Sequence, residues 1–595
     1  MCAGAHPVPG SFGPAPVLGA HNLAGAARVC ETMRVKLLAL SVVASCALGC
    51  APLRGGTETA APAPAATTAA MGPATLDPLI EALWREAKAT PAPAADDGAF
   101  LRRASLDLIG RVPTLAEARA FLAEAAPDRR ARAVDRLLGS HEFAEHWGDV
   151  YADLLFGQER KAARLEKQYD PQSWLVKAFE ENRGYDQIAR ALITASGDLR
   201  DNGAVGFVVA RARGGGGPEA VTGAAARIFL GLQIQCAQCH DHPYDKRWKQ
   251  EDFYGLVAYF ARTKPKNEKI TGDLGQMNMM MAGADASETA PAPAATTKAK
   301  AKVKVPKTFV LVDVPRGEAR MRRPHSEEDL LVSPRFLGRE VLPREGETRR
   351  QALARAVLAS DLFPKAMVAR TWAQLFGIGI VDPWDDLGGE GDPRHPAILN
   401  ALARDFVASG YDIKRLVRTI VLSTAYARGG GGSDAGLAVF AQAGVRPLQP
   451  EQLFRSLVVA TGAEEMGKRR RDPEKVEKKL SQAFKEYQFV FGDDEMAEAN
   501  RFDGSVPQSL LLMNGELTNG GTRGDEGGVL AQILAASPDP GARVDDLYLA
   551  AYTRRPTAQE RAPLLEYLRN QHHARAAYED LFFALCTSTE AITNH

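Results

Sequence analysis

Apolar residues recur three and four positions apart over most of the chain, which is the spacing of an amphipathic helix. Strand-like alternation is nearly absent. A helix start is predicted at Asp77-Pro78, a capping residue followed by proline at the first helical position. A second start is predicted at Thr114–Glu117, which forms a capping box. The pattern predicts a mainly α fold, with further helical stretches at 131–140, 146–156, 174–181, 349–360, 365–376, 395–409, 413–426 and 452–462.

Two segments carry too little apolar surface to form a core. Residues 51–73 are Ala, Pro and Thr repeats and are predicted to be a disordered tether. Residues 263–332 contain an Ala/Pro/Lys low-complexity stretch and are predicted to be a linker. Within the linker, KTFVLVDV predicts a small β element near 305–315, as one edge strand of a small sheet. We therefore expect two helical domains, at 74–262 and 333–595.

The first 50 residues contain the pattern of an export signal. Residues 1–32 lack any periodicity and are expected to be a non-native or disordered extension. Residues 33–50 have a basic start, an apolar stretch and small residues up to Cys50, which predicts a lipoprotein-type signal peptide with Cys50 as the lipidated residue. The apolar stretch is well short of the roughly 20 residues that a membrane span requires. We expect an exported protein, lipid-anchored at the periplasmic face of a membrane or at the cell surface.

Charge and cysteine content exclude two classes of protein. The 73 basic and 73 acidic side chains cancel, so the chain lacks the basic excess of a nucleic-acid-binding protein. Beyond Cys50 only Cys236, Cys239 and Cys586 remain, which excludes a disulfide framework. Cys586 lies in an apolar run and is predicted to be a buried core residue.

The most specific chemical feature is the C-x-x-C-H pattern at Cys236, Cys239 and His240. Covalent attachment of a c-type haem needs two thiols one helical turn apart and a following imidazole aimed at the iron. Attachment takes place outside the cytoplasm, in agreement with the export signal. The pattern predicts haem c with His240 as the proximal ligand, and electron transfer to or from a periplasmic redox or envelope protein.

Four other interpretations were weighed for the same segment. A disulfide between Cys236 and Cys239 would suit an oxidising compartment. A Zn site using both cysteines is disfavoured, because tetrahedral sites usually take ligands from two separate segments. A structural envelope lipoprotein would only present helical surface to partners. A hydrolytic Zn or Fe ion would have nitrogen and oxygen ligands, for which the candidates are His240, Asp241, His242 and Asp245.

A second axial ligand of the iron would have to come from elsewhere in the chain. The QMNMMMA stretch offers Met277, and a thioether ligand raises the reduction potential of such a haem. These methionines are equally compatible with a loop at the edge of the linker. His141 and His146 are the other choices, although packing or surface roles suit them better.

Several long segments resemble one known family. With the C-x-x-C-H segment, the chain resembles the planctomycete-type cytochrome proteins, which join the second planctomycete cytochrome domain to a planctomycete-specific C-terminal domain. Both domains are of unknown function, and the cytochrome name implies a haem. The resemblance rests on residues 91–114, 134–155 and 230–245 in the first domain and 395–406, 411–426, 446–457, 506–516 and 580–595 in the second.

The chain departs from the family in two respects. Many relatives carry an additional N-terminal cytochrome c domain, which we do not expect in this chain. Relatives also typically have N-R-x-W followed by histidines, whereas this chain has Ala369, Arg370, Thr371 and Trp372, then Gln374 and Leu375. The resemblance implies that any chemistry of those histidines is lost here. His395 persists beside Pro396 and is expected to be a helix cap or a surface residue.

Overall fold

The structure of the chain is a computed structural model. It describes residues 72–157, 171–212, 216–243, 245–269, 307–323, 328–387, 394–430, 434–464, 473–491, 505–524, 527–571 and 574–595.

The fold is mainly α with small β elements, as the hydrophobic pattern predicts. In the N-terminal part the helices are α1 (Pro73–Glu86), α2 (Asp97–Ile109), α3 (Leu115–Ala123), α4 (Arg129–Leu138), α5 (His141–Phe156), α7 (Pro171–Glu180), α8 (Tyr185–Thr194), α9 (Val205–Ala212), α10 (Gly217–Ala225) and α11 (Gln250–Phe260). They continue with α13 (Arg349–Leu358), α14 (Leu362–Phe376), α15 (Pro396–Ala408), α16 (Ile413–Val421) and α17 (Asp434–Ala438). The C-terminal part contains α18 (Pro450–Thr461), α20 (Pro473–Phe491), α21 (Val506–Asn514), α22 (Glu516–Gly521), α23 (Val529–Ala536), α24 (Pro540–Tyr552), α25 (Ala558–Arg569) and α26 (Ala574–Cys586).

Local capping decides where the predicted helices begin. Helix α3 begins as expected, because Thr114 and Glu117 form a reciprocal capping box. The predicted start at Asp77 is wrong, since α1 begins four residues earlier with Pro73 in its first turn and contains Pro78. The carboxylate of Asp77 instead accepts hydrogen bonds from the backbone and hydroxyl of Thr424.

The predicted strand is present, but it lies at the centre of its sheet and not at an edge. Strand β3 (Lys307–Asp313) pairs antiparallel with β2 (Thr263–Lys269) on one side and with β1 (Gly197–Asp198) on the other. The sequence of β2, TKPKNEK, has no apolar alternation and so gave no signal of its own. Two-stranded sheets are formed by β4 (Ala319–Arg322) with β5 (Asp329–Val332), β6 (Arg335–Phe336) with β7 (Arg339–Glu340), and β8 (Arg446–Pro447) with β9 (Thr593–Asn594).

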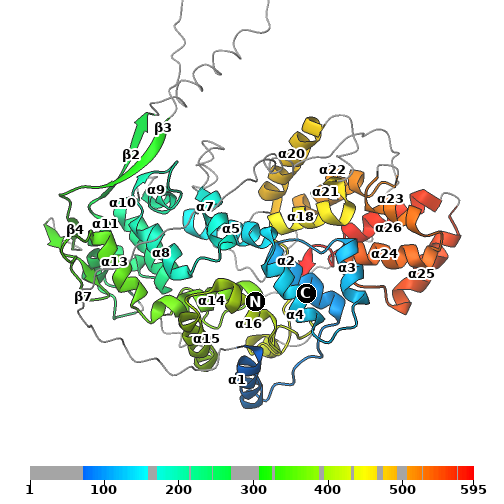
Figure 1. Cartoon of the computed structure of the whole chain (residues 1–595), viewed down its shortest axis with the longest axis horizontal. Helices are drawn as coiled ribbons and strands as arrows, with labels where there is room; N and C mark the ends of the chain where they lie inside the picture. The colour runs from blue at the N-terminus through cyan, green and yellow to red at the C-terminus, as the bar shows by residue number, and fades with distance from the viewer. Residues whose placement is uncertain are drawn as a thin grey trace, which may run out of the picture.

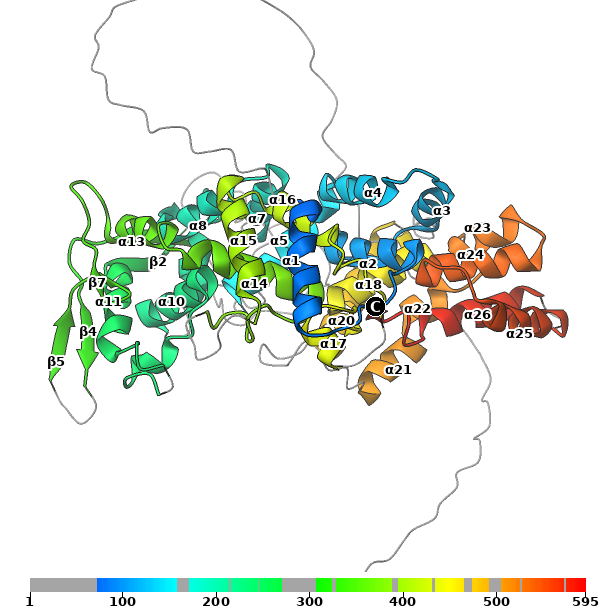
Figure 2. The same cartoon turned by 90° about the horizontal axis from the view of Figure 1, so that it is seen from below.

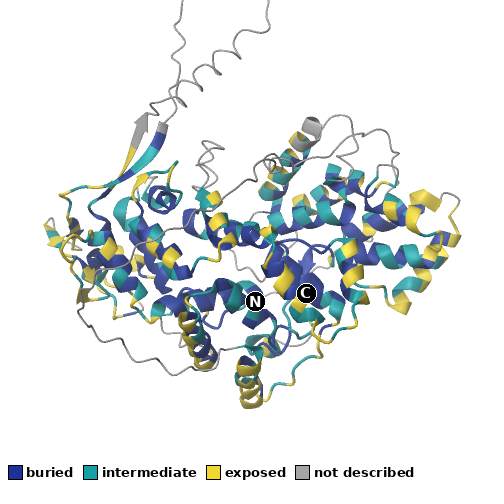
Figure 3. Cartoon of the chain, in the orientation of Figure 1, coloured by how far each residue is buried: buried dark blue, intermediate teal, exposed yellow. Residues whose placement is uncertain are grey.

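The buried apolar residues form two clusters, and the boundary between them does not fall at the low-complexity linker. The first cluster extends from Leu76 to Ala441 and so includes α13 to α16. The second contains Leu448 to Ile592 together with Leu106 and Val112 from the region of α2. The clusters form two lobes with α2 and α5 between them (Figure 1), and dark-blue buried segments run through both lobes (Figure 3). Figure 2 shows the lobe ends at β4–β5 and at α25.

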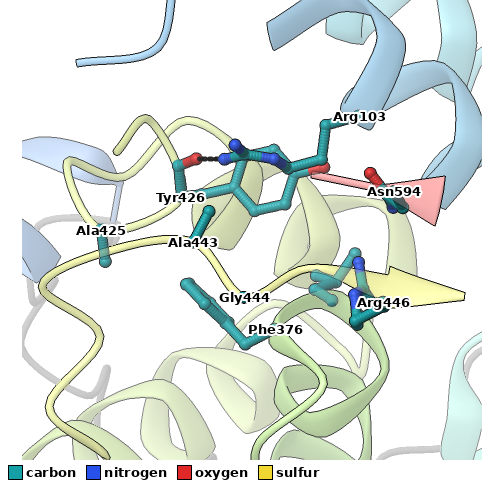
Figure 4. Close-up of a pocket in the computed structure, with 9 residues that line it drawn as sticks. Arg103, Phe376, Ala425, Tyr426, Ala443, Gly444, Arg446 and Asn594 are labelled. Carbon is teal, nitrogen blue, oxygen red and sulfur yellow. Dashed lines mark hydrogen bonds between the residues drawn. The ribbon is translucent and has the colours of Figure 1, made fainter. Parts of the chain in front are cut away.

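A buried charge network joins the two lobes. The carboxylate of Asp107 on α2 accepts hydrogen bonds from Arg446 at 2.9 and 3.2 Å, from the Tyr426 hydroxyl at 2.7 Å and from Asn594 Nδ2 at 2.8 Å. Figure 4 shows Arg103, Arg446 and Asn594 around a small cavity of about 10 Å³, which has room for about one water molecule. The network ties α2 to both β8 and β9.

Two further expectations concern membranes and Cys586. Within the described ranges, no helix has the length and apolarity needed to cross a bilayer. Cys586 is confirmed as a core residue, and its burial raises the pKa of its thiol to about 12.

Candidate functional site

The backbone leading to the C-x-x-C-H segment is unusual. Helix α10 runs directly into a π-helical turn, Ala226–Leu230, which ends at Gly231 with φ of +63°. A Cβ atom at Gly231 would lie 2.7 Å from Leu387 Cδ1, and the Gly231 carbonyl accepts a hydrogen bond from the Leu387 amide at 2.8 Å. Single π turns occur frequently at functional sites. The backbone at Gly231, just before the C-x-x-C-H turn, therefore packs closely against the loop that follows α14.

A short 3₁₀ helix, Gln235–Gln238, contains Cys236 and ends immediately before Cys239. Its central residue, Ala237, is fully buried, whereas Cys236 and Cys239 are both exposed. The Cys239 amide donates to the Cys236 carbonyl at 3.4 Å, which places the two cysteines one turn apart. Neither cysteine forms a disulfide. The two cysteines are therefore both exposed and one turn apart.

The hydrogen bond of His240 defines which ring nitrogen is available. Nδ1 lies 2.7 Å from the carbonyl oxygen of Asp241. A carbonyl can only accept, so Nδ1 carries the hydrogen, and in the neutral ring Nε2 keeps its lone pair. A histidine that binds a metal through Nε2 is commonly oriented by such a bond.

The space behind the turn is filled. Six side chains, five of them apolar, pack against Ala237, and the space they enclose does not admit a water molecule. A macrocycle attached to the two thiols would therefore lie on the outer surface and not in an internal cavity. These side chains are Ile234, Trp248, Asp252, Phe253, Leu256 and Leu337.

Gln250, at the start of α11, holds the turn in place. Its side chain is 5% exposed, and Nε2 donates to the carbonyls of Gln238 at 3.2 Å, Cys239 at 3.4 Å and Arg322 at 2.9 Å. Its backbone amide donates to Asp241 Oδ1 at 2.9 Å. One buried amide side chain thus joins the motif, α11 and β4. This role could not be predicted from the sequence, because a lone glutamine is ordinarily a surface residue.

The candidate oxygen and nitrogen ligands of an ion are engaged with the protein itself. His242 Nδ1 accepts the Asp245 amide at 2.9 Å, so in the neutral ring Nε2 carries the hydrogen. The carboxylate of Asp245 accepts hydrogen bonds from the guanidinium and the amide of Arg247. In the described part of the chain, no three His, Cys, Asp or Glu side chains are placed to hold a metal ion.

Two family models match the chain in the expected order. The first, PSCyt2, described as a protein of unknown function (DUF1549), matches residues 75–265. The second, PSD1, described as a protein of unknown function (DUF1553), matches residues 349–568. The chain belongs to the family that joins these two domains. Among curated proteins and among solved structures, none matches it significantly.

The PSD1 domain contributes an acidic loop to the surroundings of the PSCyt2 motif. Asp385, which is 1% exposed, pairs with Arg227 and accepts a hydrogen bond from Gln233 Nε2 at 2.7 Å. Burial, together with the charges of Asp385 and Asp245, raises the pKa of Asp386. The sequence could not place this loop, because more than 140 positions separate it from the motif. The surroundings of the motif are thus built from both family domains.

The departure from N-R-x-W lies inside the PSD1 core. Ala369 and Trp372 on α14 are completely buried, and Arg370 is 7% exposed. His395 occupies the N-cap position of α15, but its side chain makes no capping hydrogen bond. The residue is 9% exposed, and Nε2 lies 3.1 Å from the Ala438 carbonyl oxygen. The expected surface role is therefore wrong, because the ring packs against Phe440, whereas His395 does stand at the predicted helix start.

The two candidate histidines of α5 lie in different environments. His141 is exposed and pairs with Glu180, whereas His146 is buried and burial lowers its pKa to about 3. These positions agree with the surface and packing roles expected for them. Met277 and Cys50 lie outside the described residues, as do the predicted signal peptide and residues 51–71 of the predicted tether. The tether prediction extends two residues too far, because Gly72 is the N-cap of α1 and Pro73 is its first residue.

Proposed function

We propose that this protein is an exported, lipid-anchored c-type haem protein that transfers electrons to or from a periplasmic partner. The observation that carries the proposal is the joint exposure of Cys236, Cys239 and His240 on one turn, with both sulfurs free. Thioether formation requires such thiols, and iron ligation requires an imidazole nitrogen that still has its lone pair.

The residues present fit the attachment of a haem at the surface. Covalent attachment through the two thiols needs no enclosing cavity, and the Nδ1 hydrogen bond of His240 leaves Nε2 as the donor atom. When bound, the haem would supply one-electron chemistry. The chain's own residues would orient it: Gln250 holds the motif backbone, and Gly231 holds the segment against the PSD1 loop.

A metal ion without porphyrin is the weaker alternative. His242 and Asp245 would each have to give up a hydrogen bond to serve as ligands. Exposed vicinal thiols also suit a reversible disulfide, which would be a different redox function of the same two residues.

The test is expression in the periplasm together with haem-maturation proteins. We expect a Soret absorbance band and a covalent haem on the peptide that contains residues 236–240. A colourless protein whose peptide mass shows two free thiols or a disulfide would contradict the proposal.

Matched variants sharpen this test. Cys236→Ala and Cys239→Ala should each remove one covalent attachment, and the double variant should lose covalent haem altogether. Cys586→Ala is the control, because its thiol is buried in the second cluster. Equal loss of haem in the control would show that folding, and not attachment, is being measured.

The lipid anchor is tested separately. Cys50→Ala should move the exported protein from the detergent phase to the aqueous phase of a Triton X-114 partition. An unchanged partition would contradict lipidation at Cys50 without affecting the haem proposal.

A further inference from the structure

An exposed apolar surface lies on α20 and α21, in the lobe of the second cluster. Val506, Leu510 and Met513 of α21 are 73%, 53% and 58% exposed, and Phe489 of α20 is 88% exposed. In the described part of the chain nine large apolar side chains are exposed, and these two helices carry four of them. Apolar residues exposed singly are ordinary, whereas a group of them on neighbouring helices marks an interaction surface.

The exposed apolar side chains of α21 form one stripe. They stand four and three positions apart, so Val506, Leu510 and Met513 lie on the same side of the helix. The buried residue of α21, Leu512, lies two positions from Leu510 and therefore faces the other side. Figure 2 shows α21 at the rim of its lobe. The helix thus packs on its own chain with one side and presents an apolar stripe on the other.

Phe489 lies at the N-terminal end of this stripe. Gln508 in the first turn of α21 donates through Nε2 to the carbonyl of Val490 at 3.4 Å, which brings the end of α20 beside the start of α21. Tyr487 and Phe491, two positions before and after Phe489, are buried in the second cluster. Because residues two positions apart face different sides of a helix, Phe489 lies on the outer side of α20.

Helix α21 buries little for a helix of its length. It has nine residues, and helices shorter than about 12–15 residues are marginal in water unless they pack against something. Its own chain supplies the capping box of Ser505 and Gln508 and, among its nine residues, buries Leu512 alone. Packing of the apolar stripe against a further surface would supply the stabilisation that this short helix lacks.

The charge of the surface distinguishes between the possible partners. Helix α21 contains no charged residue, and the exposed Lys485 and Glu486, which precede Phe489 on α20, carry opposite charges. A helix that lies on a membrane carries lysines and arginines on its polar face, and a strongly charged protein surface requires the opposite charge. A second copy of the same neutral, apolar surface meets no like-charge repulsion.

The size of the surface suits a weak dimer. The four side chains expose on the order of 400–500 Å² of apolar surface, which is at the upper end of what a monomeric protein carries in one patch. With a polar rim, burial of this surface on two copies reaches about 1,200 Å², the lower end of the range for specific interfaces.

We propose that the stripe of α21, together with Phe489, is the contact surface between two copies of this chain. Helix α21 of one copy packs on α21 of the second copy around a two-fold axis, so each exposed side chain is buried twice. The C-x-x-C-H turn packs on the first cluster through Ala237 and lies in the other lobe. The dimer therefore does not depend on the attachment of a haem.

The first experiment measures the mass of the full chain by sedimentation velocity as a function of concentration. The chain carries Cys50→Ala, so that a lipid anchor cannot cause association. The mass should rise from one chain toward two with a Kd of about 1–100 μM, and amide hydrogen exchange over residues 506–514 should slow as the dimer forms. A mass of one chain throughout this range would overturn the proposal.

Matched variants locate the contact. Leu510→Asp should raise the Kd at least tenfold, roughly, because it buries a carboxylate opposite its own copy. Leu331→Asp is the control, because this leucine of β5 is 65% exposed in the other lobe, and it should leave the Kd unchanged. Phe489→Ser should weaken the dimer as Leu510→Asp does, and it decides the question if Leu510→Asp does not fold. Equal weakening by Leu331→Asp would overturn the proposal.

A lipid surface is the competing occupant of the stripe. The chain with Cys50→Ala should not sediment with vesicles of phosphatidylcholine and phosphatidylglycerol. Sedimentation with these vesicles that is lost in Leu510→Asp would assign the stripe to a membrane and overturn the dimer.

Discussion

Arg446 Nη2 donates to both carboxylate oxygens of Asp107 across 339 positions of sequence, and both side chains are largely buried. Asp107 lies within the PSCyt2 range and Arg446 within the PSD1 range. The pair therefore joins the two family domains. Tyr426 and Asn594 also donate to Asp107, so this carboxylate is the centre of the contact.

Asp107→Asn should destabilise the protein by about 3–5 kcal/mol, because it leaves Arg446 buried without an anion. The measurement is urea-induced unfolding of the full chain. Asp128→Asn is the matched control, because its carboxylate is 62% exposed and its pair with Arg132 is long. We expect a change below about 1 kcal/mol there. Equal losses in both variants would contradict the central role of Asp107.

His146 should make stability depend on pH. Burial lowers its folded-state pKa to about 3 from the ordinary 6.5, so between these values the unfolded state binds the proton more readily. The free energy of unfolding is therefore unaffected by His146 above pH 6.5 and decreases as the pH falls toward 3. The decrease is about 2 kcal/mol at pH 5. His146→Gln should flatten this part of the pH profile of unfolding. An unchanged profile would show that His146 is not protonated on unfolding.

Gln250→Ala should loosen the C-x-x-C-H turn, because three carbonyls lose their donor. We expect a loss of about 1–3 kcal/mol and faster amide hydrogen exchange over residues 236–241. Gln482→Ala is the control, since this exposed glutamine only bonds Glu486 on its own helix. Exchange that changes equally in both variants would argue against Gln250 as the residue that holds the turn.

Gly231→Ala should cost more than Gly410→Ala. Both glycines have a left-handed backbone, with φ of +63° and +72°, so an alanine is strained at either position. Only at Gly231 would the new Cβ meet another atom closely, at 2.7 Å from Leu387 Cδ1, whereas Gly410 has open space. The expected difference in unfolding free energy is about 1–3 kcal/mol. Equal costs would mean that Leu387 moves aside without penalty.

Local features of this fold could be predicted from the sequence. The capping box at Thr114, the run that forms β3 and the burial of Cys586 each depend on residues within about ten positions of one another. The start of α1 was missed because Asp77 resembles a cap, yet its carboxylate binds Thr424, some 350 positions away. No periodicity reports such a partner.

In the candidate site, too, local features could be predicted from the sequence and long-range contacts could not. The spacing of Cys236, Cys239 and His240 could be predicted, and the structure places all three at the surface. Gln250, Asp385 and the π turn could not, because each matters only through groups that folding brings beside it. The sequence also gave no means of telling that Ala237 closes the apolar wall behind the thiols.

The pairing of β8 with β9 has a consequence for how the chain is made. Asn594 donates to Asp107 across 487 positions, so the buried carboxylate cannot acquire its full set of donors until the segment that contains Asn594 has been synthesised. Contacts between residues so far apart in sequence form slowly, so we expect the hydrogen bonds of Asp107 to be completed late in folding.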